Sequence, residues 1–594
     1  MKYQNIIPFS LILLLLQGFC LKATAQKDTT KLNQQVEVVK AYKPTVSNAA
    51  KINLLPEISD TTLFRPDLNY QTTSHPITSG FQSSVLKPSN QFQREIIIPG
   101  FGKVSGGLGT YFTPFLDFYL SNPNSKNGTL GVQFNHLSSQ GKIGLKGGGE
   151  MEAPFSTNRG IVFGSYVIKG ATISSEFSYQ RDMNKFYGYP VAIPANISTN
   201  NFVKYFGQNQ LNQFGYFDFA VKSNASSKSD FKYNTGLNVS YFNTSTSQVE
   251  KSIRIKGDFE QYFGSITGKF SGAVEQLETD NVAADPYFFG LASSPKSTWL
   301  KAAPSILFQN DIVSLEGGLN FFAVFNDLSR SLLKAYPRAA LTIRTSDNNF
   351  TFYAGVDGNM QHNSYTRIAE ENRWINPFLD VAPTNNVWII SGGVKGKIAT
   401  PLSYNLGVRY NYAEDQYFYV TRIENKSGNA TPALTDLTYD NAFSVVGDNM
   451  GTIDFQGDLY YTTPKVFLHL NGHFYTYQLT SLDKAPYMPD FTLNVISGFR
   501  VTGKISATAE LYITGPRNVM LFYYQSPISS MSAPPPIYLL TDAMVEANIG
   551  AKYQFSKHLE FFGKAENLLN RKDEPWYGYT VQGLRFKLGA GFSF

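Results

Sequence analysis

Paired histidines are the first residues in this sequence whose type and spacing could hold a metal ion. His469 and His473 lie in a stretch whose apolar and polar residues alternate, as in a β-strand. Both side chains would face the same side, but four residues of strand separate them by roughly 13 Å, too far for one ion. We therefore expect them to be polar lining and predict no metal site and no cofactor. The other histidines are His75, His136, His362 and His558.

Signatures of catalysis are missing from the sequence. There is no Gly-x-Ser-x-Gly turn, and no Gly-Lys pair is followed by the Ser or Thr that a phosphate loop requires. The single cysteine, Cys20, lies in a leader that we expect to be removed, so the mature chain cannot form a cysteine-based zinc or redox site. A lipase built on strands would need Ser and His side by side, and nothing selects such a pair. We predict that the protein is not an enzyme.

The elements that would position polar residues are strands with one apolar face. In the C-terminal stretch, successive side chains alternate between apolar and polar or small, which in a strand places them on opposite faces. The apolar face carries Leu584, Phe586, Leu588, Ala590, Phe592 and Phe594. Residues 543–555 repeat the pattern, with Val545, Ala547, Ile549, Ala551, Tyr553 and Phe555 on one face.

Alternating stretches of this kind recur from residue 106 to the end, beginning with candidates 106–120, 127–137 and 142–151. Short and mostly longer connections take turns between them, as in outer-membrane barrels with short periplasmic turns and longer external loops. Counting back from Phe594 gives about 22 antiparallel strands, an even number as a single-chain barrel requires. The short turns include 139–141, 169–170, 263–264, 309–311, 400–401, 463–464, 502–503 and 556–557; the long loops are 183–211, 277–296, 361–385, 415–449, 514–540 and 570–581.

The composition agrees with this interpretation. The chain has 594 residues, of which 15% are aromatic and 16% charged, with 48 glycines and 36 tyrosines. These proportions favour twisted strands with aromatic belts over a helical enzyme. The formal net charge of +6 is spread without long basic runs, so the sequence does not indicate nucleic-acid binding.

The N-terminus resembles a secretory signal. Lys2 supplies the positive start, residues 6–16 the apolar run, and Ala23-Thr24-Ala25 the cleavage site before Gln26. The apolar run is too short for a membrane-spanning helix and is broken by Pro8. We therefore expect residues 1–25 to be a cleaved signal peptide and the protein to reside in the outer membrane.

Residues 26–105 differ from the rest of the chain. They are polar and punctuated by prolines, with one clear extended run at Val36-Glu37-Val38-Val39. We expect an extended periplasmic or lumenal segment, or a flexible leader, followed by the barrel over 106–594. The fold class is then all-β, a transmembrane antiparallel β-barrel with a short N-terminal segment.

The end of the chain resembles that of TonB-dependent outer-membrane receptors. The matching residues are Glu566-Asn567-Leu568-Leu569-Asn570, Tyr577-Gly578-Tyr579, Gly583-Leu584-Arg585-Phe586 and the terminal Phe594. The resemblance implies a 22-stranded barrel active in transport or ligand reception, and it makes Val36–Val39 similar to the segment with which such receptors engage TonB. Residues 26–105 are too few for a complete plug domain, so the chain is similar to a plugless or plug-truncated relative.

Besides a barrel enzyme acting on lipids, which would show hydrolysis sensitive to serine reagents, two functions stay open. One is transport or reception across the outer membrane, with the lumen gated by the N-terminal segment, by infolded loops or by a partner such as TonB or another envelope protein. The other is a scaffold or assembly barrel that docks other envelope proteins. Outer-membrane lipid would surround the barrel in either case.

The inward charged residues and the aromatic loop segments each allow two interpretations. The inward polar set holds both signs, so its charges could pair with each other or with the N-terminal segment, or they could form an ion filter; the set comprises Arg409, Glu510, Glu546, Lys552, Arg585 and Lys587. We favour pairing. Aromatic loop segments, Phe186–Tyr189 and Phe522–Tyr524, could anchor loops at lipid headgroups or stack on sugars, and we favour anchoring.

Overall fold

A computed structural model describes most of the chain after residue 100. The described residues are 101–122, 127–146, 148–189, 207–223, 230–246, 248–281, 296–326, 332–345, 349–376, 379, 381–425, 437–525 and 536–594. Residues 1–100, including Val36, Glu37, Val38 and Val39, lie outside this set.

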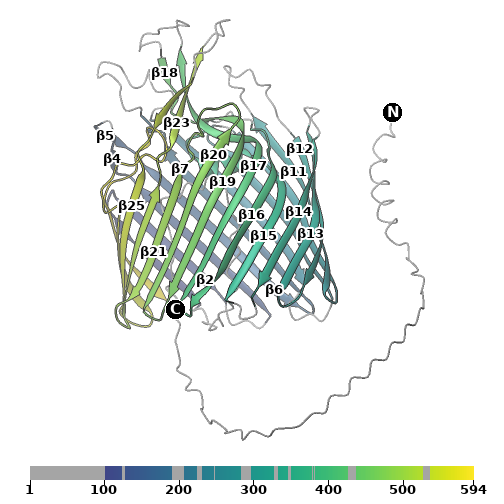
Figure 1. Ribbon diagram of the computed structural model, residues 1–594. Coiled ribbons are helices and arrows are strands. Elements are labelled where there is room, and N and C mark those ends of the chain that lie inside the picture. Colours follow the sequence, from purple (N-terminus) through teal and green to yellow (C-terminus); the bar gives the residue numbers. More distant parts are fainter. Residues whose placement is uncertain are drawn as a thin grey trace, which may run out of the picture. The chain divides into compact units, whose positions relative to one another are not determined.

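Twenty-two antiparallel strands form a closed barrel, as predicted (Figure 1). Each strand pairs with its neighbours in the chain, and β1 pairs with the final strand β27, so that no barrel edge is left open. The strands are β1 (Gly102–Gly109), β2 (Thr113–Ser121), β3 (Gly128–Ser139), β6 (Phe155–Ile168), β7 (Ala171–Lys185), β8 (Asn209–Ser223), β9 (Phe231–Thr244), β10 (Gln248–Phe263), β11 (Ile266–Asn281), β12 (Lys296–Gln309), β13 (Val313–Asn326), β14 (Leu332–Arg344), β15 (Phe350–Gln361), β16 (Thr384–Ala399), β17 (Leu402–Asn425), β19 (Ser444–Thr462), β20 (Val466–Leu479), β21 (Phe491–Arg500), β22 (Ile505–Thr514), β25 (Met544–Gln554), β26 (Leu559–Glu566) and β27 (Arg585–Ser593).

The two ends of the barrel differ. We call the end at which β27 finishes the turn end, because its connections are mostly tight turns, and the opposite end the loop end. The strands that flank each long loop predicted from the sequence have their connected ends at the loop end. That end also carries the hairpin β4 (Lys142–Gly144) and β5 (Glu150–Glu152), and the helix α3 (Tyr365–Glu371).

A small second sheet extends above the barrel wall at the loop end. The last residues of β17 pair with β18 (Leu437–Tyr439) on one side and, in parallel, with β23 (Asn518–Gln525) on the other. β23 in turn pairs with β24 (Ile537–Leu540). The buried ion pair of Arg422 with Asp440, at 2.9 Å, fixes this extension of β17 to the turn after β18.

The predicted number of strands is correct only because one missed strand is offset by one strand that does not exist. Residues 106–120 were expected to form one strand, whereas β1 and β2 reverse direction at Thr110-Tyr111-Phe112. Residues 142–151 were expected to cross the barrel, but they contribute only β4 and the start of β5. The connection at Ser139–Gly141 therefore lies at the loop end, not among the short turns, and β3 runs opposite to the expected direction.

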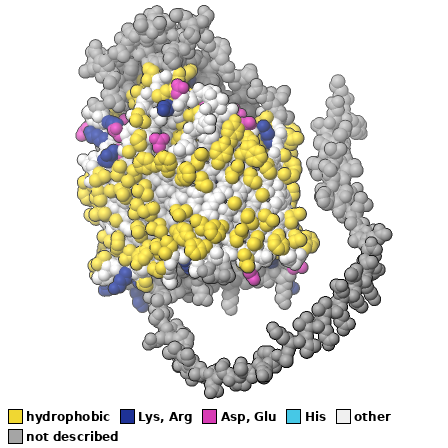
Figure 2. All heavy atoms as spheres, in the orientation of Figure 1, with side chains coloured by type: hydrophobic (Ala, Val, Ile, Leu, Met, Phe, Trp, Pro, Cys, Tyr) yellow, Lys and Arg dark blue, Asp and Glu magenta, His cyan; other side chains and the backbone are white. Residues whose placement is uncertain are grey.

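The outer surface of the barrel is apolar. Alternate residues of each strand point outward, and in β27 these are Phe586, Leu588 and Phe592, which are 50%, 71% and 46% exposed. Figure 2 shows hydrophobic side chains over much of the visible face of the barrel wall, with charged side chains gathered toward its two ends. This is the surface of a transmembrane barrel, whose strands alternate apolar-out and polar-in. Among the described residues no helix is long and apolar enough to cross a membrane.

Candidate functional site

Aromatic side chains from several loops meet at the loop end in one buried cluster, which we call the lid. Its members come from the connection after β7, the loop that carries α3, the long strand β17 and the loop before β27. The cluster comprises Phe186, Phe214, Phe242, Tyr365, Ile368, Ala369, Ile375, Leu379, Tyr417, Tyr419, Ala442, Phe443, Tyr487, Val519, Leu521, Trp576 and Tyr579. Burying this many large apolar side chains gives these loops a hydrophobic core of their own.

Two Tyr-Gly-Tyr segments make the closest contact in the lid. The backbone N–H of Tyr189 donates to the carbonyl of Gly578 at 3.1 Å. Gly578 has φ +80°, and a Cβ atom there would lie 2.8 Å from the Tyr189 nitrogen; a Cβ atom on Gly188 would lie 2.2 Å from the Tyr579 ring. Only glycine allows both this backbone conformation and this approach.

Stacked rings join these segments to the α3 loop. The rings of Trp374 and Tyr579 stack with centroids 4.1 Å apart, and Tyr187 meets Tyr579 edge-on at 4.9 Å. The Tyr187 hydroxyl donates to the carbonyl of Thr580 at 3.0 Å. Burial raises the pKa of both Tyr187 and Tyr579, so both phenols stay neutral hydrogen-bond donors.

Carboxylates attach helix α3 to the barrel wall. Ser364 caps the helix, and Glu250 of β10 accepts from the backbone N–H of Tyr365 at 2.8 Å. Glu371 accepts from the hydroxyls of Tyr417 and Tyr419 at 2.6 and 2.9 Å. Glu370 accepts from the Tyr216 hydroxyl at 2.5 Å, and burial raises the pKa of Glu370. The helix is thereby connected to β8, β10 and β17.

His362 lies at the start of the loop that carries α3 and is shielded from solvent. Its ring stacks on Trp299 with centroids 4.5 Å apart. Burial, together with the nearby guanidinium groups of Arg254 and Arg367, lowers the pKa of His362 to about 4, so this histidine stays uncharged at neutral pH.

The loop before β27 is fixed by the residues that resemble the receptor family. Asn567, at φ +51°, donates to the carbonyls of Arg571 and Gln582, and Asn570 accepts from the backbone of Leu584. Arg517, fully buried, donates to the carbonyls of Glu574 and Pro575 at 2.9 Å each. These contacts explain the Asn-Leu-Leu-Asn pattern as a structural turn that presents Trp576 and Tyr579 to the lid.

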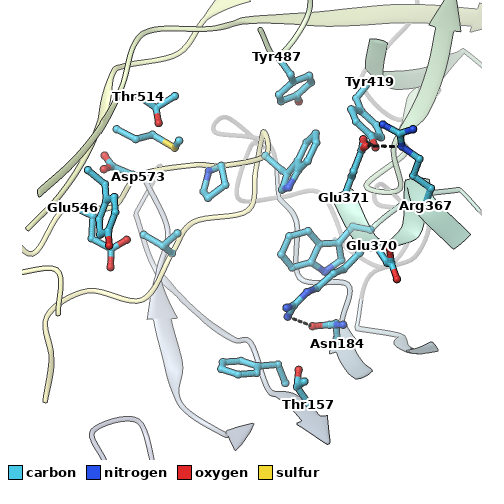
Figure 3. A pocket seen from close by; sticks show the side chains of 18 of the residues that line it. Thr157, Asn184, Arg367, Glu370, Glu371, Tyr419, Tyr487, Thr514, Glu546 and Asp573 are labelled. Atoms are coloured by element: carbon cyan, nitrogen blue, oxygen red, sulfur yellow. Dashed lines mark hydrogen bonds and ion pairs between the residues drawn. The ribbon is translucent and has the colours of Figure 1, made fainter. Parts of the chain in front are cut away.

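A cavity of about 1420 Å³ lies inside the barrel beneath the lid. Figure 3 shows Arg367, Glu370 and Glu371 on one side of it, and Glu546 and Asp573 across from them. Its wall also contains many amide side chains, three further arginines on strands (Arg159, Arg409 and Arg585), and the aromatic rings of Tyr187, Trp374 and Trp576. Amides, guanidinium groups, carboxylates and rings together can bind a polar organic ligand or a peptide.

The inward charges pair with each other, as favoured from the sequence. Glu566 accepts from Lys587 and Arg585 at 3.1 Å each, and Arg585 also reaches Glu546 at 3.1 Å. Lys552 and Lys103 share Glu560, and Lys564 meets Glu510 at 3.1 Å. Arg409 lines the cavity.

The two spaced histidines have separate partners. His469 lies 3.2 Å from Asp458 and His473 lies 2.9 Å from Asp454. Within the described ranges no group of three or more histidine, cysteine or carboxylate side chains is placed to hold a metal ion.

The sequence did not predict the lid, although the aromatic segment Phe186–Tyr189, which contributes to it, was singled out as a lipid anchor. Phe186 is 3% exposed and Tyr187 packs on Tyr579, so this segment is part of a protein core rather than a lipid anchor. The prediction of headgroup anchoring is wrong here because the partner rings lie some 390 residues away in the chain. The side chains of Tyr523 and Tyr524 lie outside the described set.

No family model and no curated protein matches this chain. Solved structures do match its fold. The FrpB iron transporter from Neisseria meningitidis aligns with a TM-score of 0.61 at 9% identity, over 84% of this chain and 82% of its own. The siderophore receptor PirA from Acinetobacter baumannii gives 0.60 at 13%, over 84% and 80%. The pyoverdine outer membrane receptor FpvA from Pseudomonas aeruginosa gives 0.59 at 12%, over 84% and 79%.

These neighbours are receptors and transporters, not enzymes. The barrel has the fold of TonB-dependent receptors, as the resemblance at the C-terminus implied.

Proposed function

We propose that this chain is an outer-membrane receptor barrel that serves transport or ligand reception, with its lumen gated by residues 26–100 or by a partner. The observation that carries the proposal is the cavity of about 1420 Å³ beneath the lid. The lid covers it at the loop end, and the described residues place no plug in it. Barrels of 22 strands in known transporters are plugged, because an open lumen would leak.

The proposal includes the route to the membrane. Residues 1–25 act as a cleaved signal peptide, residues 26–100 remain as the gating segment ahead of β1, and lipid of the outer membrane surrounds the apolar outer surface. Val36, Glu37, Val38 and Val39 would engage TonB. Retention of the full-length chain on immobilised TonB periplasmic domain, lost when these four residues are deleted, tests that contact; equal retention of both forms removes it from the proposal.

A second candidate is a non-transporting scaffold that docks other envelope proteins. The observation in its favour lies at the loop end, where a buried ion pair between Arg422 and Asp440 and a fully buried Arg517 fix the described parts of the β17 extension and of the loop before β27. A fixed surface suits docking better than gating. Two results would favour this candidate. One is a stable complex with another envelope protein in mild detergent. The other is the absence of conductance even after the lid loop and residues 26–100 are removed.

Conductance in planar bilayers tests the gating proposal. Two barriers in series are expected, the lid and the N-terminal segment, so each is removed alone and both together. The lid is opened by replacing residues 363–381 with a short Gly/Ser linker, which can close the gap because β15 and β16 are neighbours. The segment is removed by deleting residues 26–100.

The chain lacking both barriers should conduct much more than the chain lacking only the lid loop. Equal conductance of these two forms would show that residues 26–100 do not gate the lumen, and a partner would then have to supply the plug. The comparison is made in the lid-opened form because an intact lid could hide the effect of the segment.

A further inference from the structure

The wall of the cavity beneath the lid is rich in amide side chains. Among the described residues that line it, eleven are asparagine or glutamine. An amide both donates and accepts hydrogen bonds, as a sugar hydroxyl does. At about 1420 Å³ the cavity also exceeds the roughly 300–1,000 Å³ of sites for drug-sized ligands. Its size and chemistry therefore suit a long ligand with many hydroxyl groups.

Hydrogen bonds between side chains hold several of these amides in fixed orientations. Asn411 donates to Asn386, and Asn386 donates to Asn359, at 3.0 Å each, across β17, β16 and β15. On β3, Gln133 donates to Asn135 at 2.9 Å. The amide nitrogen of Asn359 and the amide oxygen of Gln133 end these chains with no further partner in the part of the molecule that the structure describes. Such preorganised groups can bind a ligand at a lower entropic cost.

Two buried polar groups beside the lid contacts lack a hydrogen-bond partner. Asn184 is 3% exposed; its amide oxygen accepts from Arg373 at 3.1 Å, the dashed line at Asn184 in Figure 3, but its amide nitrogen has no partner among the described residues. Thr580 is 1% exposed; its carbonyl accepts from Tyr187, but its hydroxyl is likewise unsatisfied within the described ranges. Both residues line the cavity. Since buried polar groups are rarely left unsatisfied, these two indicate a ligand that completes them.

One arginine of the wall remains available to an anionic group. The carboxylates of the wall are already bound by protein donors: Glu370 by Tyr216, Glu371 by Arg367, Glu546 by Arg585 and Asp573 by Arg571. Arg159 of β6 also lines the cavity, but it is exposed and makes no hydrogen bond or ion pair with a described residue. Its guanidinium group can therefore bind a carboxylate of the ligand.

The closed barrel favours a saccharide over a peptide. Extended peptides are often held by an unpaired strand edge, and the strands of the described barrel present none, since β1 pairs with β27. Trp374, by contrast, lines the cavity and is half-buried, with its ring stacked on Tyr579. A flat ring of this kind offers apolar surface to the C–H face of a sugar.

We propose that the cavity beneath the lid binds an oligosaccharide that carries carboxylates. The fixed amides bind its hydroxyl groups, Asn184 and Thr580 bind the sugar unit next to the lid, and Arg159 binds a carboxylate. This inference rests on the proposed role in ligand reception and names the class of ligand.

Calorimetric titration of the full-length protein in mild detergent tests the proposal with three probes. Hexagalacturonate has both features, its methyl ester keeps the sugar chain without the charge, and hexaglutamate keeps the carboxylates on a peptide. Hexagalacturonate should bind most tightly, the methyl ester about tenfold more weakly, and hexaglutamate not measurably. The same titrations of the chain lacking residues 26–100 test whether that segment blocks the cavity.

Two substitutions separate the recognition of charge from that of the sugar. Arg159→Gln should weaken hexagalacturonate binding about tenfold and leave methyl ester binding unchanged. Thr580→Val removes the buried hydroxyl while keeping the shape of the side chain, and it should weaken both several-fold. The matched control is Lys256→Gln, since Lys256 is an exposed cation of β10 outside the cavity wall; it should change neither.

Three results would overturn the proposal: hexaglutamate binding as tightly as hexagalacturonate, binding of the acid and of its ester with equal affinity, or no binding of any sugar to either form of the chain. Conductance separates this inference from the gating function. If hexagalacturonate binds while deletion of residues 26–100 from the lid-opened form leaves conductance unchanged, the ligand site stands and gating fails. If no probe binds while that deletion raises conductance, only the ligand class is wrong.

Discussion

At the scale of single residues, two glycines determine how closely the lid loops approach. Gly188 faces the Tyr579 ring, and Gly578 lies under the Tyr189 backbone in a left-handed conformation. The sequence showed both Tyr-Gly-Tyr segments, and it indicated the second as part of a family pattern. It could not show that the two segments bind each other, because a contact across almost four hundred residues leaves no periodic signal.

Gly578→Ala should loosen the lid without disturbing the barrel. A Cβ atom at φ +80° would cost about 1–2 kcal/mol in backbone strain, and its approach to Tyr189 would add to that cost. Hydrogen exchange of residues 186–189 and 573–580 should accelerate, while exchange of the strands stays unchanged. The matched control is Gly503→Ala, where a Cβ atom would meet nothing within 4 Å. Unchanged exchange in both lid segments would mean that the two loops do not depend on this approach.

At the scale of elements, strands were readable where alternation was regular and turns had conventional residues. The β1–β2 turn was missed because Tyr111 and Phe112 hold φ +58° and +46°, a conformation that usually calls for glycine or asparagine. The hairpin of β4 and β5 was misjudged because its residues alternate as a barrel strand would, although it is much too short to cross a membrane.

Helix α3 shows more clearly which elements the sequence pattern could not predict. Its seven residues fall inside the predicted loop 361–385, and only Tyr365, Ile368 and Ala369 are buried. So short a helix is unstable alone, and its stability depends on tertiary contacts. Those contacts are carboxylate hydrogen bonds to strands far away in the chain, which no local pattern predicts.

Glu371→Gln should therefore destabilise α3. The carboxylate receives two tyrosine hydroxyls, and hydrogen bonds to charged groups contribute about 1.5–3 kcal/mol. Exchange of the α3 amides should rise, and the fluorescence of the neighbouring Trp374 should become more accessible to a quencher. Glu260→Gln, at the turn end, removes the same charge far from the lid and should leave both measurements unchanged. A helix equally protected in both variants would show that ring packing alone holds it.

At the scale of the whole molecule, charge is distributed unequally between the two ends of the barrel. The loop-end cations Lys146, Lys251 and Lys296 each face a carboxylate, at 2.7, 3.5 and 2.9 Å from Asp542, Asp280 and Glu278. At the turn end, the described residues of one sector carry six cations, which we call the basic rim: Arg344, Lys395, Lys397, Lys465, Arg500 and Lys504, from the turn ends of β14, β16, β20, β21 and β22. Since a sector of cations at a pore mouth attracts ions of the opposite sign, the opened barrel should select anions.

The chain lacking both the lid loop and residues 26–100 should show an anion-selective reversal potential in a potassium chloride gradient. The selectivity should weaken as salt increases, because the screening length falls from about 10 Å at 0.1 M to about 3 Å at 1 M. Neutralising three rim cations, with Arg344→Gln, Lys395→Gln and Lys504→Gln, should reduce the selectivity strongly. The charge-matched control, with Lys146→Gln, Lys251→Gln and Lys296→Gln at the loop end, should change it little. If both sets reduce it equally, net charge rather than the basic rim determines the selectivity of the pore.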